Sequence, residues 1–183
     1  MATNILLVNQ KGGVGKTTFA DEIAWGLERR GHKVGFGNLD PQGGANHEKN
    51  LLDDEDAVNV IDTLGFLSDD TAEYAKNADI AIIPVQPGTL GLKPMKRTIK
   101  VITEANPDLS FAIIINNFAG NQTVDRQFLE LLEADDLPVL GTVPTAAAFK
   151  QGAALGKPVY EIAKNGKAAQ AIENILNELE EVL

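Results

Sequence analysis

Short apolar runs alternate along the chain with longer stretches in which apolar residues recur at helical spacing. This alternation is typical of βαβ units and predicts an α/β fold, with a mostly parallel central sheet and helices on both faces. The length of 183 residues predicts one domain over 1–183. The predicted strands are 5–8, 33–39, 57–61, 80–84, 111–115 and 139–143, and the predicted helices are 17–30, 71–78, 93–105, 124–134, 145–154 and 167–182.

A glycine-rich stretch follows the first predicted strand, where residues 9–18 read NQKGGVGKTT. Glycines let successive backbone N–H groups curl around an anion, and the next helix directs its unpaired amides to the same point. Lys16 adds a positive charge for the β- and γ-phosphates, and the Thr17 hydroxyl is suited to ligate Mg²⁺, which prefers oxygen. The segment therefore predicts a phosphate-binding loop whose nucleotide-binding residues are Gly12, Gly13, Val14, Gly15, Lys16, Thr17 and Thr18.

Composition narrows the classes of protein that fit this pattern. The net charge of −10 argues against a protein that coats DNA by bulk electrostatics, and the absence of cysteine excludes disulfides and thiolate metal sites. The chain starts without a basic leader, and its first apolar run is too short to span a membrane, so we expect a cytoplasmic protein. His32 and His47 stand alone in the pattern and are expected to be exposed or to cap helices.

One predicted helix carries a basic face in this acidic chain. Pro94 is placed in the first turn of that helix, a position that tolerates proline. The face is either a solvated helix surface or a surface for non-specific DNA or a partner. Its residues are Lys93, Lys96, Arg97 and Lys100.

The glycine loop departs from the usual pattern G-x-x-x-x-G-K-[ST], because Gln10 stands where the first glycine would fall. A second lysine, Lys11, opens the loop instead, and this form resembles the deviant Walker A loop of the ParA/MinD superfamily of dimerising ATPases. The resemblance implies a P-loop NTPase of the ParA/MinD (SIMIBI) type that uses ATP and Mg²⁺. It also implies that Lys11 reaches across a dimer interface to the phosphates held by the partner subunit.

Two strand ends extend the resemblance. Residues 38–44 read NLDPQGG and resemble the switch I segment D-x-D-P-Q-G, which implies that Asp40 is catalytic and orients the attacking water. Asn38 replaces the first aspartate of that motif and removes a negative charge near the metal. Asp62, which ends an apolar run, resembles the Walker B aspartate that holds Mg²⁺ through water; an Asx turn or helix cap is the alternative.

Later segments resemble the same superfamily. Asn116 and Pro144 follow two predicted strands at the positions that border the adenine in ParA relatives, although both residue types are also common in turns. The last predicted helix has an acidic polar face, which an anionic lipid surface would repel, so no membrane role is expected.

The resemblance spans essentially the whole chain and is closest to the short plasmid-partition ParA and ParF-like proteins. It implies an ATP-dependent homodimer, with higher assemblies possible, that segregates plasmid DNA and hydrolyses ATP slowly. A centromere-binding, ParB-like protein would stimulate the hydrolysis, and an association with the nucleoid is possible. The alternative is a MinD-like or carboxysome-type positioning ATPase whose cargo is protein.

Overall fold

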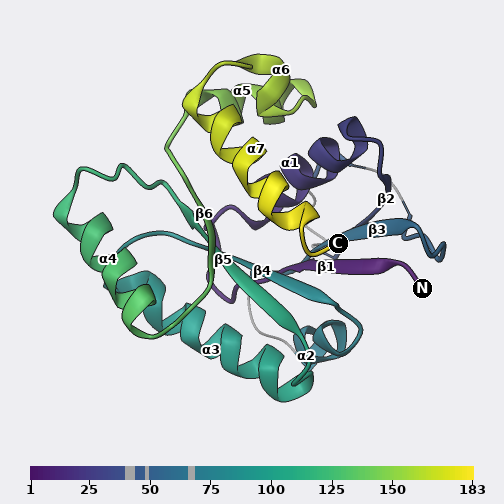
Figure 1. The fold of residues 1–183 in the computed structure, drawn as a ribbon, viewed down its shortest axis with the longest axis horizontal. Helices are drawn as coiled ribbons and strands as arrows, with labels where there is room; N and C mark the ends of the chain where they lie inside the picture. The colour runs from purple at the N-terminus through teal and green to yellow at the C-terminus, as the bar shows by residue number, and fades with distance from the viewer. Residues whose placement is uncertain (40–43, 48–49, 66–68) are drawn as a thin grey trace.

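The computed structural model describes residues 1–39, 44–47, 50–65 and 69–183, without the side chains of 69 and 70. Across these residues, six strands form one sheet in the order β2-β3-β1-β4-β5-β6, and every neighbouring pair is parallel (Figure 1). The strands are β1 (Thr3–Leu7), β2 (Lys33–Asn38), β3 (Ala57–Asp62), β4 (Ile80–Val85), β5 (Ser110–Asn116) and β6 (Val139–Val143). The predicted α/β architecture is confirmed.

The two faces of the sheet are covered by different helices (Figure 1). Alternate residues of a strand point to opposite faces, so Ile5 and Leu7 of β1 enter one core cluster while Leu6 enters the other. Helices α1 and α7 close the first cluster, and α2, α3 and α4 close the second. The helices are α1 (Lys16–Arg29), α2 (Asp69–Lys76), α3 (Thr89–Ala105), α4 (Thr123–Ala134), α5 (Ala147–Leu155), α6 (Val159–Ile162) and α7 (Lys167–Glu180).

Helix α3 begins at Thr89, one turn earlier than the sequence predicts. Gly88, with a φ of 115°, leads into this turn, and Pro94 therefore lies inside the helix and not in its first turn. Proline has no N–H group to donate to the carbonyl one turn before it. The Pro94 carbonyl in turn accepts a hydrogen bond from Thr98 Oγ1 at 3.0 Å.

Two polar contacts with α1 were not predicted from the sequence. The short helix α6 begins where Val159 N donates to both carboxylate oxygens of Glu22, at 2.9 and 3.1 Å. His47 is buried, contrary to expectation: its Nδ1 lies 2.9 Å from Asp21 Oδ1, and its ring stacks on Phe36 and tilts against Trp25.

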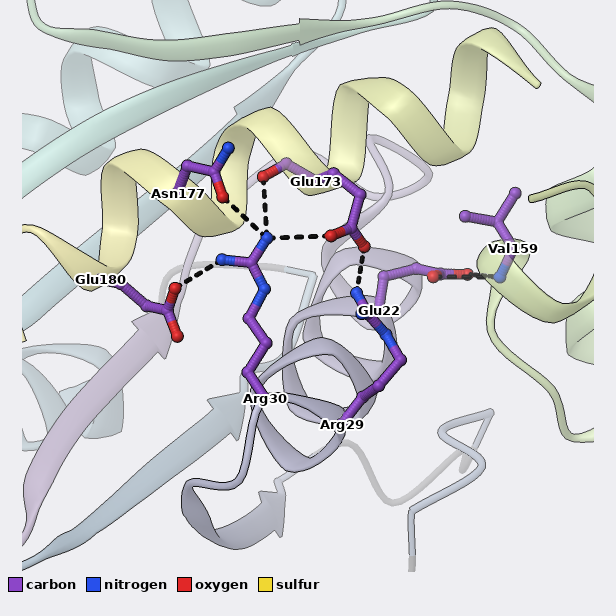
Figure 2. Close-up of polar contacts among 7 residues, drawn as sticks. All are labelled: Glu22, Arg29, Arg30, Val159, Glu173, Asn177 and Glu180. Carbon is purple, nitrogen blue, oxygen red and sulfur yellow. Dashed lines mark hydrogen bonds and ion pairs between the residues drawn. The ribbon is translucent and has the colours of Figure 1, made fainter. Parts of the chain in front are cut away.

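Helices α1 and α7 are joined by a group of ion pairs, shown in Figure 2. Arg30 contacts Glu173, Glu180 and Asn177, and Arg29 contacts Glu173. The acidic face of α7 is thus partly a docking face for α1. Among the described residues, no helix is both long enough and apolar enough to cross a membrane.

Candidate functional site

The glycine loop joins the carboxyl end of β1 to the first residue of α1, at the centre of the sheet. Gly13 and Gly15 have φ values of 72° and 105°, in the left-handed region that favours glycine. A Cβ atom at Gly15 would lie 2.7 Å from Asn116 Nδ2, so this position also lacks room for a side chain. The backbone path of the predicted phosphate loop therefore depends on glycine at both positions.

Lys16, the first residue of α1, is only 7 % exposed. Its Nζ lies 3.5 Å from the Lys11 carbonyl oxygen, which places the ammonium group over the loop. A hollow of about 300 Å³ opens here, lined by the loop, by the first residues of α1, and by Thr63 and Gly65 beyond β3. The hollow combines backbone amides, a helix N-terminus and a lysine, which is the combination that binds phosphate groups.

Thr17 lines this hollow and is hydrogen-bonded to the buried Asp62. Thr17 Oγ1 donates to Asp62 Oδ2 at 2.7 Å, and Asp62 is fully buried at the end of β3. The parallel register explains the contact, because Asp62 is paired with Leu7, the last residue of β1 before the loop. A hydroxyl and a carboxylate form an all-oxygen donor set of the kind that Mg²⁺ prefers, so these residues fit the predicted metal site.

Asp40 lies outside the described residues, but the chain on either side of it is described. On one side Leu39 N donates to the Asp62 carbonyl at 2.9 Å. On the other side Asp21 of α1 accepts from the backbone N–H groups of Asn46 and His47, at 2.9 to 3.2 Å. Both ends of the segment are therefore tied to the two elements that carry Thr17 and Asp62, and the catalytic role of Asp40 stays a prediction.

The loop that contains Lys11 is held to the neighbouring strand and helix. Lys11 N donates to Asn9 Oδ1 at 3.0 Å, and Asn9 Nδ2 donates to the Pro84 carbonyl of β4 at 2.8 Å. Gln86 Nε2, beyond β4, donates to the Gly13 carbonyl at 3.1 Å. The Lys11 side chain itself is half-buried, and its reach into a partner subunit stays a prediction.

Asn116 touches the loop rather than an open pocket. Its Nδ2 donates to the Val14 carbonyl at 2.9 Å, and its Oδ1 accepts from Asn117 N at 2.8 Å. Pro144 lines a different hollow, of about 650 Å³, between the ends of β5 and β6 and the start of α7. The structure thus places Asn116 against the phosphate loop and Pro144 farther along the sheet edge, and adenine binding by either stays a prediction.

The four basic residues of α3 are all exposed, as the pattern predicts. Two of them form ion pairs: Lys96 Nζ lies 2.6 Å from Asp135 Oδ2, and Lys100 Nζ lies 3.7 Å from Glu104 Oε1. These pairs offset part of the positive charge of the face.

Sequence reasoning missed three residues that hold segments around the site. Asp21 anchors the segment after Asp40, Gln86 holds the Gly13 carbonyl, and Thr98 of α3 accepts from Gln10 N at 3.1 Å. Asp21 and Thr98 are buried polar residues on helices, and only their polarity at positions facing the core distinguishes them in the sequence.

Comparisons with known proteins identify the family and confirm the fold. Residues 5–159 match the family model described as the CobQ/CobB/MinD/ParA nucleotide binding domain. The chain is 28% identical over 209 residues to the maintenance of carboxysome distribution protein A of Halothiobacillus neapolitanus, covering 97% of this chain and 96% of that protein.

Two solved structures show the same fold. One is a protein described as a plasmid partition protein, from Borrelia burgdorferi B31, bound to AMPPNP, with a TM-score of 0.82 and 18% identity over 100% of both chains. The other is the MinD cell division protein of Aquifex aeolicus, with a TM-score of 0.80 and 18% identity, covering 98% of this chain and 97% of that one. The chain belongs to the CobQ/CobB/MinD/ParA family of nucleotide-binding domains and is a ParA/MinD-type protein, a group whose members are ATPases.

Proposed function

We propose that this protein is an ATP-dependent partition ATPase, which dimerises when it binds ATP and Mg²⁺ and hydrolyses the ATP slowly. The observation that carries the proposal is the hollow lined by Lys16 and Thr17 at the carboxyl edge of the sheet, with the buried Asp62 carboxylate hydrogen-bonded to Thr17. A phosphate loop alone would support nucleotide binding. The buried carboxylate beside Thr17 adds the negative charge that would help to hold the Mg²⁺ used in phosphoryl transfer.

Some residues around the hollow would bind the nucleotide and Mg²⁺, and others would position the attacking water. The backbone amides of the loop and the Lys16 ammonium would hold the β- and γ-phosphates. Thr17 directly, and Asp62 through water, would hold Mg²⁺, which when bound neutralises the charge that develops on the phosphate oxygens. Asp40 would orient the attacking water, and Lys11 would reach the triphosphate bound by the second subunit. Asn116 and Pro144 would border the adenine.

Plasmid DNA is the cargo that we propose first. A centromere-binding, ParB-like protein would stimulate hydrolysis and so release the dimer, or a larger assembly of dimers. Because the net charge is −10, any non-specific contact with DNA has to be local, and the α3 face of Lys93, Lys96, Arg97 and Lys100 is the candidate. This activity would take place in the cytoplasm, at the nucleoid.

A second candidate function is the positioning of a protein cargo. It is favoured by the Halothiobacillus neapolitanus relative, which is named for carboxysome distribution and matches over nearly the full length of both chains. Both functions use the same ATP-dependent dimerisation and hydrolysis, and they differ only in whether the ATP-bound form carries DNA or a protein.

Three assays test the proposed cycle of ATP binding, dimerisation and hydrolysis: fluorescent-nucleotide binding, light scattering and phosphate release. We expect the wild type to dimerise with ATP and Mg²⁺, Lys16→Ala to lose nucleotide binding, and Asp40→Ala to accumulate as the ATP dimer. Lys33→Ala, at an exposed position on β2, is the control and should behave as wild type. Unchanged turnover in Asp40→Ala would remove Asp40 from the mechanism.

A gel shift of duplex DNA with ATP then separates the two cargoes. Retardation that needs ATP supports a DNA cargo. If the ATP dimer forms but shifts no DNA at low salt, plasmid partition is contradicted and the positioning of a protein cargo is favoured.

A further inference from the structure

A groove with an apolar floor runs between α3 and α4. Val124 and Leu131 of α4 line it and are 44% and 48% exposed. Leu92 of α3 and the buried Phe128 of α4 line the hollow between them. Val124, Phe128 and Leu131 are spaced at i, i+4 and i+7, so they form one stripe along α4.

The dimensions of the groove indicate what it can hold. The hollow has a volume of about 80 Å³. Small-molecule sites are usually clefts of roughly 300–1,000 Å³, so this one suits a side chain of another polypeptide instead. A hollow set in an open apolar stripe is the surface into which an amphipathic helix lays its apolar face.

The charges beside the groove indicate which charges a partner helix should carry. Leu92 and Lys96 share one stripe of α3 at i and i+4, and Lys93 and Lys100 lie on the adjoining stripe at i and i+7. These basic residues flank the groove on the α3 side and are not part of its lining, to which α4 contributes the uncharged Gln127. Lys96 pairs with Asp135 and Lys100 with Glu104, whereas Lys93 forms no ion pair with a described residue and supplies the positive charge beside the groove. The concentration of exposed lysines contrasts with the net charge of −10. An apolar stripe with a basic flank is complementary to an apolar stripe with an acidic edge.

We propose that the α3–α4 groove docks an amphipathic helix of a partner protein, with acidic residues along the edge of its apolar stripe that faces α3. DNA would use the lysines but would leave the aliphatic residues of α4 exposed, since non-specific binding depends on phosphate contacts. The apolar stripe therefore favours a protein as the occupant of the groove, and a helix docked there would compete for Lys93 with DNA bound to the basic face of α3.

Helix α3 also contacts the nucleotide loop on its buried side. Thr98 accepts from Gln10 N, and the residues just before α3 include Gln86, which donates to the Gly13 carbonyl. A helix docked on the outer side of α3 would thus bind an element that is hydrogen-bonded to the phosphate loop. This consequence rests on the proposed function, whereas the docking itself does not.

Nuclear magnetic resonance with synthetic helices tests the docking directly. The probe is a peptide with leucine at helical spacing and glutamate along one flank, titrated into the ¹⁵N-labelled full chain without nucleotide. Two matched peptides replace either the glutamates with lysine or the leucines with serine. We expect saturable shift changes confined to α3 and α4, and binding of both matched peptides weakened at least about tenfold.

Variants at exposed positions locate the site. Leu131→Asp and Lys93→Glu should each weaken binding of the acidic peptide about tenfold, and Lys93→Glu should improve binding of the lysine peptide. Leu155→Asp, on α5 and 65% exposed, is the control and should change nothing. Lys93→Glu tests the groove even if Leu131→Asp fails to fold.

Three outcomes would overturn the proposal. They are no binding of the acidic peptide, equal binding of all three peptides, and binding that neither groove variant weakens. Duplex DNA titrated in parallel gives the competing result. If Lys93→Glu weakens DNA binding while the acidic peptide does not bind, the face belongs to nucleic acid. None of these outcomes bears on the proposed ATP-dependent dimerisation and hydrolysis, which the light-scattering and phosphate-release assays test separately.

Discussion

Replacing Glu22 with glutamine should change how the stability of the protein depends on pH. Glu22 lies on α1, is 4% exposed, and accepts the Val159 N–H at the start of α6 (Figure 2). Burial raises the pKa of this carboxyl from 4.5 to about 7; the hydrogen bond from Val159 lowers the pKa and the neighbouring Asp21 adds to the rise. The charged form of Glu22 is therefore disfavoured in the folded protein.

The sign and size of the effect follow from proton linkage. Because the folded pKa lies above the unfolded value, the folded state binds more protons between pH 4.5 and about 7, and stability falls as pH rises through that window. The raised pKa corresponds to a decrease in the free energy of unfolding on the order of 3 kcal/mol once Glu22 is ionised, because each unit of pKa shift is equivalent to about 1.4 kcal/mol. Glutamine keeps an oxygen acceptor for the Val159 N–H and has no charge at any pH.

We therefore expect Glu22→Gln and wild type to have similar stability near pH 5 and the variant to be more stable at pH 8, by up to roughly 3 kcal/mol. Urea denaturation of the nucleotide-free protein at pH 5, 6, 7 and 8 measures this difference, in which the other titrating groups cancel. Glu178→Gln, at an exposed position on α7, is the control and should show no such trend. A Glu22→Gln variant that is less stable by the same amount at every pH would refute the reasoning.

Four further changes test the site and the packing around it. Lys11→Ala should still bind ATP but lose ATP-dependent dimerisation by light scattering; normal dimerisation would contradict the cross-subunit role. Gly15→Ala should abolish fluorescent-nucleotide binding, because its Cβ would lie 2.7 Å from Asn116 Nδ2 and the backbone has a φ of 105°. Asp62→Asn should raise the Mg²⁺ concentration needed for half-maximal turnover at least about tenfold, since the carboxylate charge that would hold a metal-bound water is lost. Arg30→Ala should lower the free energy of unfolding by about 1–3 kcal/mol, because Glu173 and Glu180 lose a charged donor, and Arg126→Ala on α4 is its control.

The sheet and the phosphate loop were predictable from the sequence because both depend on local pattern. Buried parallel strands read as apolar runs, and a glycine loop between strand and helix has one strong physical interpretation. The position of Asp62 beside the loop follows from the same pattern, since parallel strands bring their carboxyl ends to one edge, but its contact with Thr17 came from the structure. The order of the strands and the register of Leu7 with Asp62 needed the structure.

The parts that escaped prediction depend on contacts between distant segments. Asp21 and Glu22 resemble ordinary polar helix residues in the sequence, yet each anchors a segment that lies far along the chain. The start of α3 was misplaced because Pro94 favours a first turn by local preference, whereas the packing of α3 extends the helix back to Thr89. Such tertiary effects leave no periodic trace in the sequence.

The ties on either side of Asp40 connect the proposed catalytic residue to the metal site. Leu39 is bonded to Asp62 of β3, and Asn46 and His47 are bonded to Asp21, one turn beyond Thr17 on α1. The residues that would hold Mg²⁺ therefore belong to the same two elements that anchor the segment carrying Asp40. Loss of the Asp21 anchor should consequently reduce turnover without reducing nucleotide binding, whereas loss of Thr17 should reduce both.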